Sequence, residues 1–305
     1  MQEGSRKAII AAFFANLGIA VAKFVGFILT GSAGLLAEAG HSVADTGNQG
    51  LLMFGSKRGS RPADRAHPFG YGPERYFWSF IVALVLFSMG GLFALYEGIQ
   101  KVSHPHEVES AFIAYGILGF SIVLETFSLR TAVKEANHVR NGRSWWQFIR
   151  TAKAPELPVV LLEDVGAETG LVLALFGLTM AEVTGNARWD AIGSIAIGLL
   201  LVVIAIILAV EMKGLLIGEA ASDEDLEAIN TSLAGADKVQ GIIHLRTMHL
   251  GPDQLLVAAK LDFDPSLSVA QLAQAIDDAE AALRVAVPTA VTIYIEPDIR
   301  RQPAE

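Results

Sequence analysis

The chain has 305 residues, of which 52% are hydrophobic and only 18% charged, and its mean hydropathy is +0.44. A soluble domain of this length carries roughly a quarter charged residues, so the composition indicates a membrane protein. The net charge of −9 lies almost wholly in residues 213–305, with 7 basic and 15 acidic residues; residues 1–212 hold 16 and 17. The lack of a basic region argues against a nucleic-acid partner. The lack of cysteine excludes disulfides and thiolate metal ligands.

Six stretches are long enough to cross a hydrocarbon core about 30 Å thick, which takes roughly 20 apolar residues. The second is the most polar, because it contains Glu38, His41, Asp45 and Asn48. We still predict a span there, since these residues are concentrated in one part of it. The predicted spans are 7–30, 33–54, 77–100, 111–129, 157–181 and 189–210.

Basic residues gather in alternate connections. They precede the first span and fill the connections after the second and fourth, whereas the other connections hold almost none. By the positive-inside rule both termini are cytoplasmic. The charged start MQEGSRK leads into an apolar run without a clear cleavage site, so we interpret it as a retained first span. We therefore predict an integral multi-pass protein of the cell (inner) membrane.

Beyond about Ser222 the pattern becomes that of a soluble domain. Ser222 and the acids after it predict a short capped helix. Residues 238–249 and 254–263 predict two strands around a Gly-Pro turn, followed by a helix at 268–285 and a strand at 290–295. This α-β-β-α-β order predicts a ferredoxin-like layout. We expect a transmembrane domain over 1–212 and a cytoplasmic regulatory and dimerisation domain over 213–305.

Ionisable side chains inside a span cost several kcal/mol unless they are paired, solvated or bound to metal. His41 and Asp45 are four residues apart in the second span and therefore share a helix face. Asp164 and Glu168 repeat this spacing in the fifth span. Two such helices can enclose one ion, and imidazole with carboxylates suits Zn²⁺ well and Mn²⁺, Fe²⁺ or Co²⁺ acceptably. We predict a metal site of His41, Asp45, Asp164 and Glu168.

The alternative reading is that such residues only form hydrogen bonds between helices. We expect this or a proton-relay role for Glu163, which points about 100° away from Asp164. Glu38 is left as a gate, a proton acceptor or a side chain that reaches out of the membrane. Three further charged residues stand alone near helix ends, where reaching towards the membrane surface is the default; they are Lys23, Glu125 and Asp190.

The motifs resemble those of the cation diffusion facilitators, the zinc-transporter family. LLAEAGHSVAD in the second span is followed by HPFGYGPER after a basic loop, by WDAIGSIAIGLLL in the sixth span, and by GLLIGEAASDEDLEAI at the start of the soluble domain. The sequence VLLED in the fifth span most resembles that of the zinc transporter nine subgroup. The resemblance covers nearly the whole chain.

This resemblance implies a homodimer of six-span protomers that exports Zn²⁺ or a similar ion in exchange for protons. It implies central ligands at His41, Asp45 and Asp164, while the fourth position falls on Val160, which cannot bind metal. Glu168, Glu163 or water would then complete the shell.

Two peripheral sites of the family are altered in this sequence. The loop site keeps Asp64 and His67 but has Tyr71 as its third position. The soluble domain has Ile243, Lys260 and Tyr294 where relatives carry His, with Glu296 as a lone acid, so a binuclear site is not expected there.

We expect proton-coupled exchange by alternating access, because protons and metal compete for the same lone pairs. The protein is then no enzyme and needs no cofactor; its partners are the transported ion, protons, the lipid bilayer and a second copy. A cation channel and an intramembrane metalloenzyme are the rival readings. No HExxH motif supports the enzyme.

Overall fold

The computed structural model describes residues 3–105 and 111–299, with side chains from residue 16 onwards. The chain divides into two compact units. The first contains Met1–Lys57 and Phe77–Lys213, and the second contains Arg58–Tyr76 and Gly214–Glu305.

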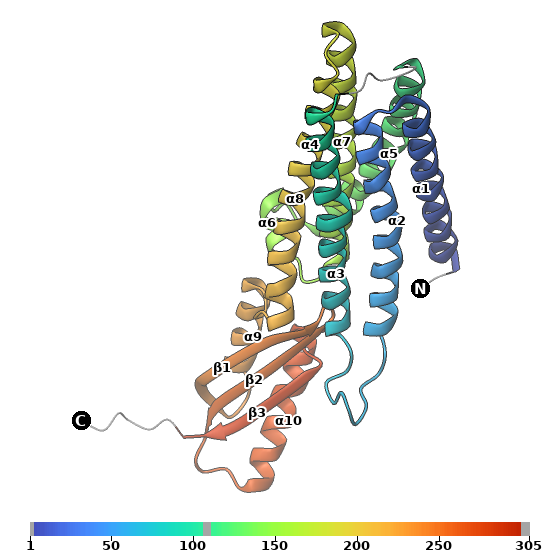
Figure 1. Ribbon diagram of the computed structural model, residues 1–305. Helices are drawn as coiled ribbons and strands as arrows, with labels where there is room; N and C mark the ends of the chain where they lie inside the picture. The colour runs from blue at the N-terminus through green and yellow to red at the C-terminus, as the bar shows by residue number, and fades with distance from the viewer. Residues whose placement is uncertain (1–2, 106–110, 300–305) are drawn as a thin grey trace, which may run out of the picture. The chain divides into compact units, whose positions relative to one another are not determined.

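The first unit is a bundle of long helices that run side by side (Figure 1). Each predicted span is matched by a helix, and most of these helices extend beyond the predicted ends. A short helix, α6, which the sequence did not predict, lies between the fourth and fifth spans. The helices are α1 (Glu3–Thr30), α2 (Ala33–Gly59), α3 (Pro73–Val85) continued by η1 (Leu86–Leu92) and α4 (Phe93–Ser103), α5 (Ala111–Val139), α6 (Trp145–Thr151), α7 (Glu156–Thr184) and α8 (Arg188–Ile217).

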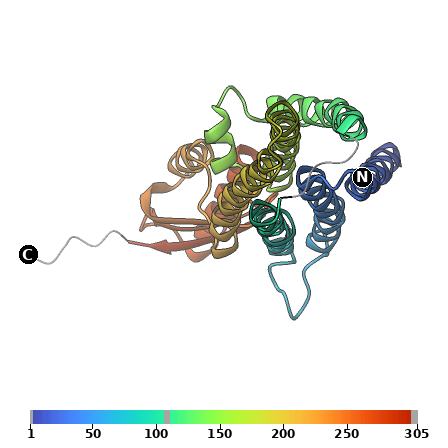
Figure 2. The ribbon, with the colours of Figure 1, turned by 45° about the horizontal axis from the view of Figure 1, so that its top comes forward.

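Three helical stretches among the described residues are long and apolar enough to cross a membrane: Pro73–Ser103, Ala111–Val139 and Arg188–Ile217. Asn16–Thr30 is a shorter apolar stretch. α2 and α7 are of similar length and carry the acidic residues singled out above. Figure 2 shows α2 between α1 and the α3–α4 stretch.

A glycine seam joins the third span to α8. A Cβ at Gly91 would lie 3.1 Å from the Val202 backbone nitrogen, and one at Gly98 would lie 2.9 Å from the Ile195 nitrogen. Gly198 of α8 approaches the other helix equally closely. Such backbone contact requires residues without side chains. Next to this seam, η1 is a π-helical segment that contains Gly90 and Gly91.

The second unit holds a three-stranded sheet of order β1-β2-β3, with β1 (Val239–Gly251) antiparallel and β3 (Thr292–Asp298) parallel to β2 (Gln254–Phe263). Alternate β2 residues from Leu255 to Phe263 are buried against α9 (Asp223–Ala234) and α10 (Val269–Ala286), so both helices cover one face. The α-β-β-α-β layout predicted from the sequence is confirmed (Figure 1).

Both α9 and α10 begin at a serine cap, and the cap at Ser222 was predicted from the sequence. The Ser222 side chain accepts a hydrogen bond from the Asp225 backbone nitrogen, and Ser268 forms a capping box with Gln271. Each cap satisfies backbone donors that the first turn of a helix leaves free. The strands and helices therefore lie within a few residues of their predicted ends.

Candidate metal site in the helix bundle

The first half of the candidate site lies on α2. His41 is fully buried, and its Nε2 lies 3.5 Å from Asp45 Oδ2, as the four-residue spacing predicts. On its other side, His41 Nδ1 lies 3.9 Å from where a Cβ at Gly90 of η1 would be. Gly90 of the π-helical turn therefore lies beside the imidazole, whereas Gly91 faces Val202 of α8. A Gly-Gly pair in an apolar span was the available sequence signal for this contact.

The second half lies on α7, where both predicted residues turn towards α5. Ser128 Oγ donates to Asp164, at 3.1 and 3.0 Å from its two carboxylate oxygens, and Thr126 Oγ1 lies 2.9 Å from Glu168 Oε1. Asp164 and Glu168 therefore share a face, as predicted, and α5 supplies their hydroxyl partners. The sequence reasoning missed both hydroxyls, because nothing in the spacing of α5 links it to α7.

Among the described residues, no three His, Asp or Glu side chains lie close enough to hold a metal ion together. The structure brings His41 to Asp45, and it places Asp164 and Glu168 against α5. The assignment of all four to one ion stays a prediction.

Several metal-binding atoms of this region are buried without a hydrogen-bond partner. They are both ring nitrogens of His41, Oδ1 of Asp45 and Oε2 of Glu168. A buried polar atom without a partner costs about 1–3 kcal/mol, so native proteins keep few of them. The carboxylate oxygens and one nitrogen of the neutral imidazole carry lone pairs suited to a cation, and they lie on the two helices from which the ligands were predicted.

Glu163 takes a different role from its neighbour Asp164. Its Oε1 accepts a hydrogen bond of 2.6 Å from Asn48 Nδ2, which ties α7 to α2. Both side chains are buried. This contact agrees with the helix-packing role expected for Glu163.

Lys23, predicted to reach towards the membrane surface, is instead fully buried, and that prediction was wrong. Its ammonium lies 3.0 Å from Glu38 Oε2 and 2.8 Å from the Ser42 hydroxyl, with Glu125 Oε1 at 3.9 Å. The three ionisable groups come from α1, α2 and α5. The ammonium of Lys23 and the carboxylates beside it compensate one another's charge, which would be costly for any of these groups alone in the bundle. Glu38 is fully buried too, which excludes the reading in which it reaches out of the membrane.

The same prediction was wrong for Asp190, which is buried at the start of α8. Its carboxylate accepts hydrogen bonds from the Ser32 hydroxyl and the Ala33 backbone nitrogen at 2.7 Å each, and from Lys101 at 3.0 Å. Lys101 also donates to the Gly31 carbonyl. This cluster joins the α1–α2 connection, α4 and α8, and every oxygen of its carboxylate has a partner.

The peripheral residues lie in the second unit. The Asp64 carboxylate accepts bonds from the backbone nitrogens of Ala66 and His67 and, at 2.8 Å, from the Tyr71 hydroxyl. These bonds, that of Tyr71 foremost, lower the pKa of the Asp64 carboxyl, although the group is exposed. His67 Nδ1 lies 3.7 Å from Asp64 Oδ1. Asp64 is thus held by its own loop.

In the soluble domain the Lys260 ammonium lies 2.9 Å from Glu296 and 3.2 Å from Asp298. Lys260 pairs with His244 on β1 and with Glu296 on β3 in the sheet register, on the face away from α9 and α10. The two carboxylates, Glu296 foremost, raise the pKa of Lys260. A protein cation therefore occupies the place between these acids.

Comparison with known proteins agrees with this architecture. Residues 9–217 match the family described as the cation efflux transmembrane domain, and residues 221–298 match the cation efflux protein cytoplasmic domain. The human proton-coupled zinc antiporter SLC30A9, a mitochondrial protein, is 32% identical over 264 residues, which cover 86% of this chain and 46% of that protein. The resemblance to the zinc transporter nine subgroup is confirmed.

Two further relatives broaden the comparison. The Arabidopsis thaliana metal tolerance protein C4 is 31% identical over 87% of this chain and 58% of its own length. The magnetosome protein MamB of a Magnetospira species is 29% identical, over 79% and 78%. A solved MamM-CTD structure matches 25% of this chain and 95% of its own, with 20% identity and a TM-score of 0.24.

The chain spans about half the length of the SLC30A9 relatives it matches. The matched family is one of transporters rather than enzymes. Because its transmembrane family model covers more than half of the residues, the chain belongs to the cation efflux family.

Proposed function

We propose that this protein exports a divalent transition metal, Zn²⁺ in the first place, in exchange for protons by alternating access. The observation that carries the proposal is the set of buried metal-binding atoms without hydrogen-bond partners on His41, Asp45 and Glu168. The SLC30A9 relatives, described as proton-coupled zinc antiporters, support the metal and the coupling.

The same geometry suggests which residue replaces the missing fourth ligand. Val160 packs in the apolar core, and Glu163 is engaged by Asn48. Glu168 retains a free oxygen on the face that also carries Asp164. We therefore assign the fourth position to Glu168, which gives one imidazole and three carboxylates. This donor set suits Zn²⁺ and, next, Mn²⁺.

The hydroxyls of α5 give the carboxylates a second set of partners. In the arrangement described, Ser128 and Thr126 occupy Asp164 and Glu168. Metal capture would replace these hydroxyls by the ion, and release would restore them. Protons drive release because imidazole and carboxylate ligands bind metal only when deprotonated. The ion is the substrate, and no resident cofactor is needed.

We further propose a homodimer with both termini cytoplasmic, placed in the cell (inner) membrane. The alternating basic connections support the orientation. The match of residues 221–298 to the family's cytoplasmic domain supports the location of the soluble domain. In this proposal residues 1–212 form the transmembrane domain, and residues 213–305 form the cytoplasmic regulatory and dimerisation domain.

The test is zinc flux in proteoliposomes under an imposed proton gradient. Asp45→Ala is expected to abolish both zinc movement and the accompanying proton movement, whereas Glu97→Gln, which alters a carboxylate of α4 outside the site, retains both. Zinc-driven proton flux that survives in Asp45→Ala contradicts the assignment. Zinc flux that does not depend on the proton gradient indicates a channel. Faster flux of Mn²⁺ than of Zn²⁺ would identify Mn²⁺ as the substrate.

A further inference from the structure

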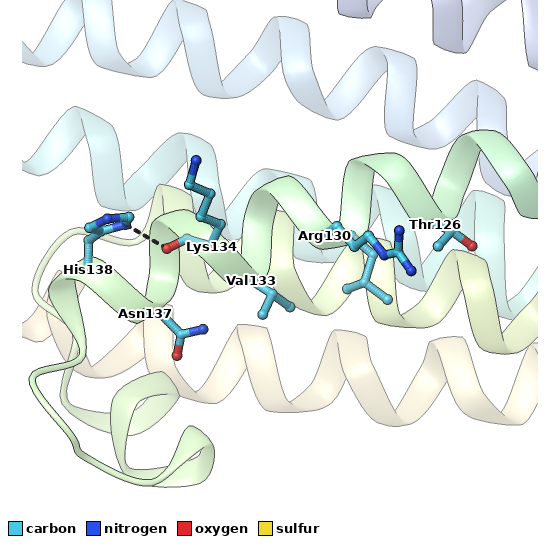
Figure 3. Close-up of a pocket in the computed structure, with 7 residues that line it drawn as sticks. Thr126, Arg130, Val133, Lys134, Asn137 and His138 are labelled. Atoms are coloured by element: carbon cyan, nitrogen blue, oxygen red, sulfur yellow. Dashed lines mark hydrogen bonds between the residues drawn. The ribbon is translucent and has the colours of Figure 1, made fainter.

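A groove of about 620 Å³ runs along α5, outside the candidate metal site (Figure 3). Its described lining residues recur every three or four positions and so follow one face of the helix. From the middle of the bundle towards the end of α5, they are Thr126, Leu129, Arg130, Val133, Lys134, Asn137 and His138.

The groove is cationic. Arg130, Lys134 and His138 follow one another at four-residue intervals, and the described lining includes no carboxylate. Arg130 and Lys134 are exposed, and within the described ranges neither side chain forms an ion pair. The His138 ring is fixed, because its Nδ1 donates to the Lys134 carbonyl at 2.7 Å (Figure 3). A lining of this charge repels a metal cation and attracts an anion.

The depth of these cations matches the edge of a membrane. Nineteen residues separate Ala111 from Arg130, which at 1.5 Å each is about 29 Å, close to the thickness of a hydrocarbon core. Leu129 and Val133 are partly buried apolar residues of the groove. Lys134 and His138 lie one and two turns beyond Arg130. The groove therefore combines apolar and cationic side chains at the level expected for the membrane surface, as a ligand with an anionic head and an apolar chain requires.

The segment that follows α5 packs against the last turns of that helix. Trp145 and Trp146 of α6 are exposed, and the Arg140 guanidinium lies 4.3 Å from the centre of the Trp145 ring. Phe148 is buried with Ala136 of α5, which fixes α6 to the bundle. Exposed tryptophans beside arginines are typical of the membrane–water interface.

We propose that this groove binds an anionic phospholipid. The phosphate is held by Arg130 and Lys134, and the first part of an acyl chain lies against Leu129 and Val133. Basic pockets of membrane proteins at the headgroup level commonly select such lipids. Thr126, at the inner end of the groove, also bonds to Glu168. If the transport proposal holds, the bound lipid therefore contacts the residue that holds one candidate ligand.

The experiment is native mass spectrometry of the full-length protein in detergent, titrated with phosphatidylglycerol or phosphatidylcholine. The wild type is expected to retain phosphatidylglycerol in preference. The double substitution Arg130→Gln with Lys134→Gln should weaken phosphatidylglycerol binding roughly thirtyfold. Each basic residue near an anionic headgroup contributes a factor of about five to the affinity. Arg188→Gln removes one exposed cation at the start of α8 and should change nothing.

A charge-keeping pair, Arg130→Lys with Lys134→Arg, separates loss of the site from loss of the fold, because it should retain most of the preference. Equal retention of both lipids by the wild type overturns the proposal, as does undiminished phosphatidylglycerol binding in the double glutamine variant. Binding is read without metal, so the result does not depend on the transport proposal.

Discussion

Two buried polar clusters in the helix bundle differ in how completely their atoms are satisfied. The Asp190 carboxylate accepts from Ser32, Ala33 and Lys101, and neither of its oxygens lacks a partner. His41, by contrast, is equally buried and has neither ring nitrogen hydrogen-bonded. A saturated cluster holds helices together, whereas one with free lone pairs is maintained at a cost in stability. The difference points to structure in the first case and to ion binding in the second.

The Lys23 cluster falls between these two. Glu38 Oε2 is paired with Lys23, but Glu38 Oε1 has no hydrogen-bond partner, although the whole side chain is buried. The cluster lies between α1 and α2, three residues before His41 along α2. The Lys23 cluster therefore shares features of the structural cluster and of the ion-binding cluster. Substitutions of Lys23 and Glu38 can show to which kind it belongs.

The largest effect on stability is expected at the saturated cluster. Asp190→Ala leaves Lys101 buried without a counter-charge and should lower the free energy of unfolding by about 3–5 kcal/mol. Thermal unfolding in detergent measures it. The double variant Asp190→Leu with Lys101→Met removes both charges and should recover most of the loss. A single variant as stable as the wild type would show that this cluster does not hold the helices.

Lys23→Met should destabilise by a similar amount, because Glu38 then loses its counter-ion. Adding Glu38→Met should restore the thermal midpoint. Zinc flux in the double variant then sharpens the comparison. Recovered flux together with recovered stability places this pair with the structural cluster, while recovered stability without flux assigns the pair to the transport cycle.

Substitution of His41 should have the opposite effect, with a loss of zinc flux and little loss of stability. His41→Gln is expected to lower zinc flux at least roughly 10–100-fold, the range seen when even an outer partner of a metal ligand is lost. The thermal midpoint should hold, because no hydrogen bond of His41 is removed. Flux in proteoliposomes and unfolding in detergent are measured on the same preparation. Unchanged flux, or a loss of stability as large as that of Asp190→Ala, would contradict the assignment of His41 to ion binding rather than to structure.

The smallest effect is expected outside the bundle, at the exposed loop. The bond from Tyr71 lowers the pKa of Asp64 below its ordinary value of 3.8, so Tyr71→Phe should raise it. The small stabilisation from this bond is present above pH 3.8 and is lost as the pH falls through the lowered pKa. Carboxyl NMR titration of aspartate-labelled protein measures the shift. Ser266→Ala is the control, since it should raise the pKa of Asp264 and leave Asp64 unchanged.

Much of the fold follows from local pattern. The spans were predictable because about 20 apolar residues in a row have few alternatives to a membrane helix. The soluble domain was predictable because Ser222 followed by acidic residues is typical of a helix start and because the Gly251-Pro252 turn separates two strand-like runs. The pairing of His41 with Asp45 follows from helical spacing alone.

The errors concern partners that are distant in the sequence. Lys23 and Glu38 are 15 positions apart, and Lys101 and Asp190 are 89 apart, so hydropathy along one helix cannot reveal either pair. Judged singly, each charge seemed better placed at the membrane surface. The hydroxyls of Thr126 and Ser128 were missed for the same reason, since only helix packing shows that α5 faces the carboxylates of α7.

The glycine seam between the third span and α8 has a consequence for motion. A Cβ added at these glycines would come within about 3 Å of the opposite backbone at several levels, so the two helices cannot slide past each other without collision. These two helices should therefore travel as one rigid body through a transport cycle. A change in access then arises between this pair and the other helices of the bundle, among them α2, whose His41 lies beside Gly90.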